Sequence, residues 1–228
     1  MINHKTLFAA SLLALSPAFA QTAAPPNLSG LWELRFDSRN IPPAAVVAGA
    51  VNAADQVARD THAIRYCYNF GVPFLMEISP IDIVQNLSGK ETAITFPYRG
   101  PSRHIYTDGR KHVNQDVFDP SSSGDSVGRW EGDTLVVDTI GFSEEGVTRI
   151  PGGGRRTPAS HLVERYRLVS GGKQLSVIFT WDDAKVFAKP HAYEFRYYRA
   201  PKGMEAREYD CNASDEERAR FLLGTPGK

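Results

Sequence analysis

Histidines and carboxylates occur in three segments of the chain where a folded sheet could bring them together. His112 follows an Asp-Gly-Arg turn, Asp138 lies within a β-branched run, and His161 and Glu164 open a later segment of alternating residues. Histidine exchanges its proton near neutral pH, and a carboxylate can orient it or act as an acid or base itself. We therefore take His112, His161, Asp138 and Glu164 as candidate catalytic residues.

Arginines and aromatic residues beside these segments are candidates for binding a substrate. The guanidinium group can hold a carboxylate or stabilise a developing oxyanion, and aromatic rings supply apolar contact. This set comprises Arg103, Arg110, Arg165, Tyr106 and Trp130. Each candidate also has a structural interpretation: Asp138 could form an ion pair with an arginine, His112 could hydrogen-bond its own turn, and the aromatic rings could be core.

Residues 161–169 leave open which side chains face inward. One face carries His161 and Arg165, and the other carries Glu164 among Leu162, Tyr166 and Leu168. If the apolar face is inside, Glu164 is a buried carboxylate and His161 lies outside. We favour His161 and Arg165 inside, because a ligand-binding lumen tolerates charge better than a packed core does.

The element that must position Asp138 is a β-hairpin over residues 124–142. Gly132 and Asp133 suit a two-residue turn with positive φ at glycine, and the β-branched residues 134–140 predict a strand. Side chains alternate along a strand, so Asp138 points away from the face that carries Leu135 and Val137. A carboxylate in such an apolar strand needs a partner or a function.

Further short alternating segments, separated by turn residues, predict an all-β protein. We expect strands over 28–36, 81–87, 91–96, 103–107, 161–169, 175–182 and 192–199. Residues 175, 177, 179 and 181 are all apolar, which favours a single lipocalin-like antiparallel β-barrel over a sandwich. An alanine-rich segment from Pro42 to about Asp60 and a capping box at 214–217 predict one or two short helices.

The first twenty residues resemble a secretory signal peptide. A short apolar run follows Lys5 and ends at the small-residue site Ala18-Phe19-Ala20, and it is too short to span a bilayer. We therefore predict a signal peptide over 1–20, one barrel domain over 21–228, and a periplasmic or secreted location. In an oxidising compartment, Cys67 and Cys211 are expected to form a structural disulfide bond.

The amino-acid composition limits the classes of molecule that the protein is expected to bind. The chain carries 26 basic and 26 acidic residues, and this balanced charge argues against nucleic acid as a partner. The sequence has no run of basic residues long enough to predict binding to a membrane surface. We expect a small-molecule ligand or substrate and no membrane insertion; the oligomeric state stays open. No phosphate loop, nucleotide fingerprint, H-x-H or H-E-x-x-H spacing occurs, so we expect neither a cofactor nor a metal ion.

Several motifs resemble a mostly uncharacterised family of exported bacterial proteins. They match R-x-I-x-x-D-G-R-x-H at 103–112, G-x-S-x-G-x-W-E-G-D-T-L-V-V-[DE]-T-x-x-F at 124–142, H-x-V-E-R at 161–165, E-Y-x-C at 208–211 and C-x-x-x-G-x-P at 67–73. The resemblance covers most of the chain after residue 20. Val113 stands where the family often carries proline.

These observations together predict a cofactor-independent acid–base enzyme, a lyase or isomerase. The expected substrate is a small, partly aromatic or hydroxylated organic acid, for example a lignin-derived phenylpropanoid that loses a small aldehyde. The alternative is a non-catalytic lipocalin-like carrier of a small apolar ligand. Convergence of His112, His161, Asp138 and Arg103 around one open cavity would favour the enzyme.

Overall fold

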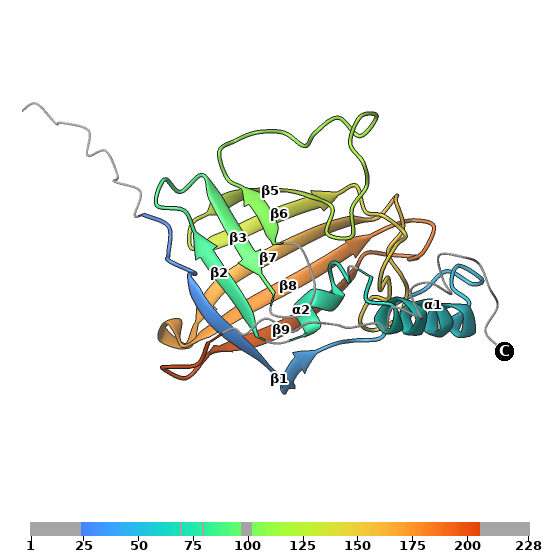
Figure 1. Ribbon diagram of the computed structural model, residues 1–228, viewed down its shortest axis with the longest axis horizontal. Helices are drawn as coiled ribbons and strands as arrows, with labels where there is room; N and C mark the ends of the chain where they lie inside the picture. Colours follow the sequence, from blue (N-terminus) through green and yellow to red (C-terminus); the bar gives the residue numbers. More distant parts are fainter. Residues whose placement is uncertain (1–23, 69, 79, 97–101, 206–228) are drawn as a thin grey trace, which may run out of the picture.

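The computed structural model describes residues 24–68, 70–78, 80–96 and 102–205, and these residues form a closed β-barrel (Figure 1). The prediction of an all-β, lipocalin-like barrel with few short helices is therefore confirmed. The strands within this part of the chain are β1 (Gly30–Asn40), β2 (Ile81–Gln85), β3 (Glu91–Thr95), β4 (Arg103–Tyr106), β5 (Asp125–Glu131), β6 (Thr134–Ile140), β7 (His161–Val169), β8 (Gln174–Asp182) and β9 (His191–Arg199).

Neighbours in the barrel are neighbours in the chain, and β9 pairs with β1 to close it. All pairs are antiparallel except β4 and β5, which are parallel. A parallel pair needs a long crossover, and residues 107–124 supply it as the loop that arches beyond β5 and β6 in Figure 1. This loop brings His112 to the outside of the barrel.

The predicted hairpin of β5 and β6 is confirmed. Glu131 pairs with Thr134, so the turn consists of Gly132 and Asp133, and Gly132 has a φ of 62°. Glycine adopts this positive φ without the steric cost that a Cβ would bring. The turn sets the register in which Asp138 lies opposite Val127.

Apolar side chains fill the inside of the barrel. Every second residue of β8 from Leu175 to Trp181 is completely buried, as the sequence pattern predicted. Aromatic residues from neighbouring strands complete this core, with Phe179 stacked against Tyr193 at 4.9 Å between ring centroids. The interior is therefore a packed core.

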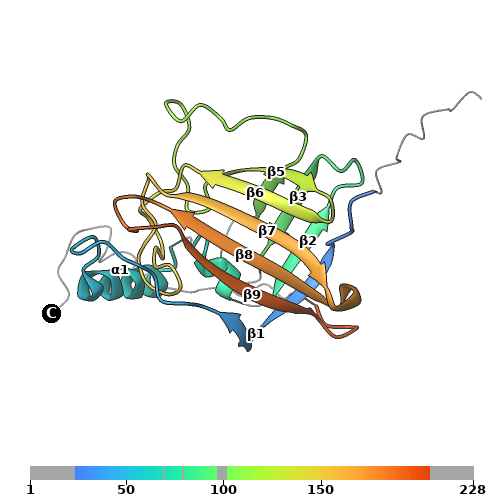
Figure 2. The ribbon, with the colours of Figure 1, turned by 180° about the vertical axis from the view of Figure 1, so that it is seen from behind.

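The α-helices lie near one end of the barrel, away from the short turn that connects β7 to β8 (Figure 2). Helix α1 spans Ala53–Arg65 and helix α2 spans Phe74–Glu77, with a short 3₁₀ turn η1 at Ser170–Gly172. The expected start of a helix at Pro42 is wrong, because Ala44 N–H instead donates to the Gly152 carbonyl. Asn52 caps α1 by accepting from the N–H groups of Ala54 and Asp55, which places its start at Ala53.

Some expectations concern residues outside the described part of the chain. These are the signal peptide over 1–20, Cys211, the motif at 208–211 and the helix at 214–217, so each stays a prediction. Among the residues that are described, no helix has the length and apolar character required to cross a bilayer.

Candidate functional site

The candidate catalytic residues Asp138 and His161 lie on the outer face of the barrel. Asp138 pairs with Val163 of β7, next to the position of His161. The alternate residues Leu162 and Tyr166 are buried in the core, so His161 points to the opposite side. Neighbouring strands thus bring Asp138 and His161 onto one shared surface.

His112 approaches this surface from the β4–β5 loop. Its Nδ1 lies 2.8 Å from Asp125 Oδ2, and its Nε2 lies 2.9 Å from Asp138 Oδ1. The same Asp138 oxygen lies 3.0 Å from His161 Nε2. The Val113 N–H donates to Asp125 Oδ2 at 3.0 Å, which anchors the loop beside the ring. We call Asp125, His112, Asp138 and His161 the outer-face cluster.

The two histidines of the outer-face cluster differ in their remaining hydrogen-bonding capacity. Both ring nitrogens of His112 face carboxylate oxygens, so both can donate only when the ring is doubly protonated. His161 uses Nε2 toward Asp138, and within the described residues its Nδ1 has no hydrogen-bond partner. The His161 side chain is 41% exposed against 21% for His112. His161 is therefore the histidine that can exchange a proton with a bound molecule.

The histidines also determine the charge of Asp138. Burial raises the pKa of Asp138, but hydrogen bonds from His112 and His161 outweigh it, so the pKa lies below its ordinary value. Asp138 is thus an ionised acceptor at neutral pH. An ionised carboxylate on Nε2 orients the imidazole and stabilises its protonated form.

Glu164 and Arg103 lie on the other face, inside the barrel. Glu164 is completely buried, and its carboxylate forms a paired salt bridge with both terminal nitrogens of Arg103. The expectation that His161 and Arg165 face inward is therefore wrong, and the alternative with Glu164 inside is confirmed. The barrel accepts this carboxylate because β4 supplies a guanidinium to neutralise it.

Other polar groups complete the environment of this interior ion pair. Arg103 also donates to Ser126 Oγ at 3.1 Å and to Thr139 Oγ1 at 2.8 Å, while Tyr166 donates to Glu164 Oε1 at 2.8 Å. Burial lowers the pKa of Arg103, but the Glu164 carboxylate more than offsets this and holds the pKa above its ordinary value. Arg103 and Glu164 are thus a structural pair inside the barrel, and the expected convergence of Arg103 with His112, His161 and Asp138 is wrong.

The remaining candidate binding residues lie at different places on the barrel. Tyr106 shares the outer face with the cluster, because it pairs with Val127, which pairs with Asp138. The Arg110 guanidinium stacks 3.7 Å from the centroid of the Tyr106 ring and also binds Asp108. The outer-face cluster therefore has an aromatic ring and an arginine two strands away.

Arg165 and Trp130 lie further along the strands. Arg165 is on the outer face and donates to Glu131 Oε2 at 2.7 Å. Trp130 lies near the other end of β5 from Asp125 and borders a cavity against residues 24–29 and the β2–β3 turn. Within the described residues, neither side chain forms a hydrogen bond or an ion pair with the outer-face cluster.

Asp125 is the cluster member that sequence reasoning missed. The hairpin register contained the signal, because Asp125 lies two residues before Val127, the partner of Asp138, and so shares its face. The surrounding residues 124–128 match G-x-S-x-G, but a hairpin and no helix follows them, so they do not form a nucleophile elbow. The serine of that motif, Ser126, is instead buried against Arg103.

The donor groups of the described residues are not arranged for a metal ion. No set of three or more His, Cys, Asp or Glu side chains in this part of the chain has a geometry that could hold one. In the outer-face cluster the donors hydrogen-bond one another directly. The arrangement is suited to proton transfer.

Comparison with known proteins adds no assignment to this geometry, since neither a protein-family model nor a curated protein matches the chain.

Proposed function

We propose that the protein is an acid–base enzyme, a lyase or isomerase, whose reacting centre is the outer-face cluster. The observation that carries the proposal is the asymmetric sharing of Asp138 Oδ1 by two histidines, which leaves His161 with an available ring nitrogen. The proposed substrate is a small hydroxylated or partly aromatic organic acid.

In this mechanism His161 is the base. Asp138 accepts the Nε2–H of His161, which leaves a lone pair on Nδ1. Nδ1 removes a proton from a substrate hydroxyl or from the carbon beside a carbonyl, and Asp138 stabilises the imidazolium that forms. The proton then returns to the product at a different atom, which completes an isomerisation.

In the lyase version the proton comes from a hydroxyl group. The carbon–carbon bond beside that hydroxyl breaks, a small aldehyde leaves, and the electron pair remains on the carbon that is left behind. Conjugation with an aromatic ring, as in a lignin-derived phenylpropanoid, stabilises this electron pair until the imidazolium returns the proton. This chemistry is complete without an organic cofactor.

His112 and Asp125 act as positioning residues. Two carboxylates, Asp125 and Asp138, hold the His112 ring in place, and its contact with Asp138 helps to orient that carboxylate toward His161. Tyr106 and Val127 offer an apolar surface next to Asp138, and Arg110 can bind a substrate carboxylate over the Tyr106 ring. The substrate would therefore lie across β4–β7.

The proposal includes export. The predicted signal peptide places the enzyme in the periplasm or outside the cell, where Cys67 and Cys211 would form a disulfide bond. Cys67 is buried, and Cys211 is outside the described residues.

The test is a turnover assay on hydroxylated phenylpropanoid acids, with released aldehyde measured by hydrazine derivatisation and isomers by proton NMR in D₂O. His161→Ala should lower kcat at least about 100-fold, because a positioned base contributes that much or more. The matched control is His62→Ala, since His62 is an exposed histidine of α1, away from the outer face of β4–β7. This control should retain full activity.

Equal activity of His161→Ala and His62→Ala would contradict the proposal. A carrier would behave differently again: native mass spectrometry would find a small molecule bound to the purified protein, and its binding would survive His161→Ala. Apolar side chains of the described residues pack the inside of the barrel, which favours the enzyme over a carrier that would need a lumen.

A further inference from the structure

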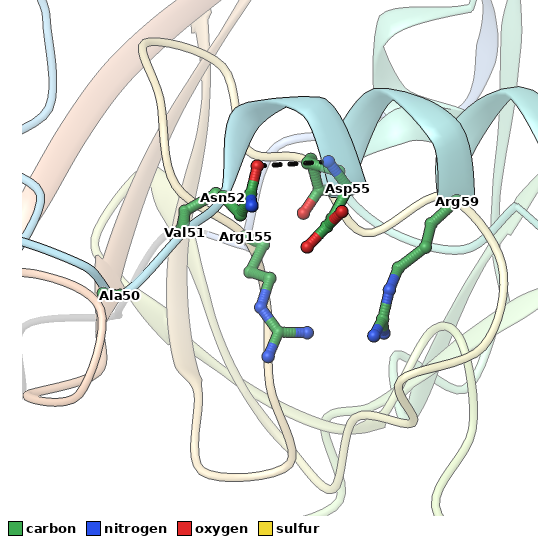
Figure 3. Close-up of a pocket in the computed structure, with 7 residues that line it drawn as sticks. Ala50, Val51, Asn52, Asp55, Arg59 and Arg155 are labelled. Carbon is green, nitrogen blue, oxygen red and sulfur yellow. Dashed lines mark hydrogen bonds between the residues drawn. The ribbon is translucent and has the colours of Figure 1, made fainter.

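A polar cavity of about 110 Å³ lies beside the first half of α1 (Figure 3). Asn52, Asp55 and Arg59 contribute to it from the helix and its cap, and Arg155 contributes from the segment between β6 and β7. Residues three, four and seven positions apart share one side of a helix, which explains why these side chains meet there. The outer-face cluster contributes no residue to this cavity.

Two guanidinium groups give the cavity its positive character. Figure 3 shows the side chains of Arg59 and Arg155 extending toward the same space below α1. Within the described part of the chain Arg59 has no ion pair, and Arg155 reaches only the Glu144 carboxylate, at 3.3 Å. Glu144 is 51% exposed, so water screens that ion pair and an incoming anion can compete with it.

Acceptor groups lie in the same wall. Asp55 presents a carboxylate from one turn before Arg59, and it has no ion pair among the described residues. Gln56 is buried, with its Nε2 donating to Asp60 Oδ1 and Thr148 Oγ1 at 2.9 Å each. Its Oε1 is buried without a hydrogen-bond partner in the described structure, and a buried unpaired acceptor is costly.

We propose that this cavity binds a small hydroxycarboxylate. The carboxylate would lie between Arg59 and Arg155, whose planar guanidinium groups match its geometry. The adjacent hydroxyl would donate to the Asp55 carboxylate, which accepts hydrogen bonds. The site is separate from the proposed reacting centre and does not depend on it.

The test is a calorimetric or NMR titration of the protein with two matched probes, (S)-lactate and propionate, which differ by the hydroxyl group. Lactate should bind saturably and at least about tenfold more tightly than propionate, because an unmatched Asp55 repels the simple acid. Asp55→Ala removes the acceptor and should abolish this preference. Arg59→Gln and Arg155→Gln should each weaken lactate binding about tenfold or more.

The control variant is Arg129→Gln, which removes an exposed arginine on β5 that pairs with Glu131, and it should leave binding unchanged. Absence of saturable lactate binding, or equal binding of lactate and propionate, overturns the proposal. Undiminished binding in Arg155→Gln overturns it too. His161→Ala should bind lactate normally, which separates a failure of this site from a failure of the proposed enzyme.

Discussion

Removing the charge of Glu164 should strongly destabilise the barrel. In Glu164→Gln the side chain keeps its size, but an amide group replaces an oxygen that accepts from Arg103. The Arg103 side chain is 1% exposed, so its charge would stay in the core without a counterion. Breaking a buried ion pair from one side costs about 3–5 kcal/mol.

This cost is measurable as a shift of the unfolding transition. A domain of this size loses about 2–4 °C in Tm for each kcal/mol, so Glu164→Gln should lower Tm by roughly 6–20 °C. Urea unfolding followed by tryptophan fluorescence gives the corresponding free energy, because Trp32 and Trp181 are completely buried. Circular dichroism during heating gives Tm.

Two further variants test the reasoning. Arg165→Gln breaks an ion pair on the exposed surface, and its Tm should stay close to that of the wild type because water and salt screen that pair. The double variant Arg103→Met/Glu164→Leu removes both charges and should be more stable than Glu164→Gln. If Glu164→Gln unfolds within about 1 kcal/mol of the wild type, Arg103 does not depend on this carboxylate and the reasoning fails.

Further predictions concern backbone geometry and pH. Gly71→Ala should lower the unfolding free energy of the protein by about 1–3 kcal/mol more than Gly89→Ala does. Both glycines have a φ of 67°, but only at Gly71 would a Cβ clash, because it would lie 2.0 Å from the Ser122 carbonyl oxygen. Urea unfolding of both variants measures the difference. Asp138 has a folded-state pKa below its ordinary value, so its stabilising contribution is present above the unfolded pKa of about 3.9 and is lost as pH falls through the folded pKa. The unfolding free energies of the wild type and Asp138→Asn should therefore converge as the pH is lowered from 5. A difference in unfolding free energy that stays constant over this titration would contradict the prediction. Burial raises the pKa of Glu77 in the folded state above its ordinary value. The wild type should therefore lose stability relative to Glu77→Gln as the pH rises from the unfolded-state pKa of Glu77 through its folded-state pKa. Unfolding free energies of both proteins at pH 4 and pH 7 test the sign of this change.

Local sequence patterns were sufficient for the strands and for the chain reversal at Gly132. Alternation from Leu175 to Trp181 identified an inward face, since a wholly apolar row is stable only when buried. The same alternation placed Asp138 away from Leu135 and Val137, and the hairpin register could also have placed Asp125 on its face. These features depend on residues close together in the chain.

The inward face of β7 was decided only by the closed barrel. Both faces of that strand carry charge, so the pattern alone did not distinguish Glu164 from His161. The partner that makes Glu164 acceptable inside is Arg103, which comes from β4, and the two meet only when the sheet closes.

The tertiary structure also decided which residues form the outer-face cluster. His112 belongs to a loop without regular periodicity, and it reaches Asp125 and Asp138 because the parallel pairing of β4 with β5 requires a crossover on that side. The sequence by itself therefore determined which residue types could transfer protons and which strands would carry them. Only the tertiary structure decided which of them meet, because burying or exposing a charge depends on partners that are distant in the chain.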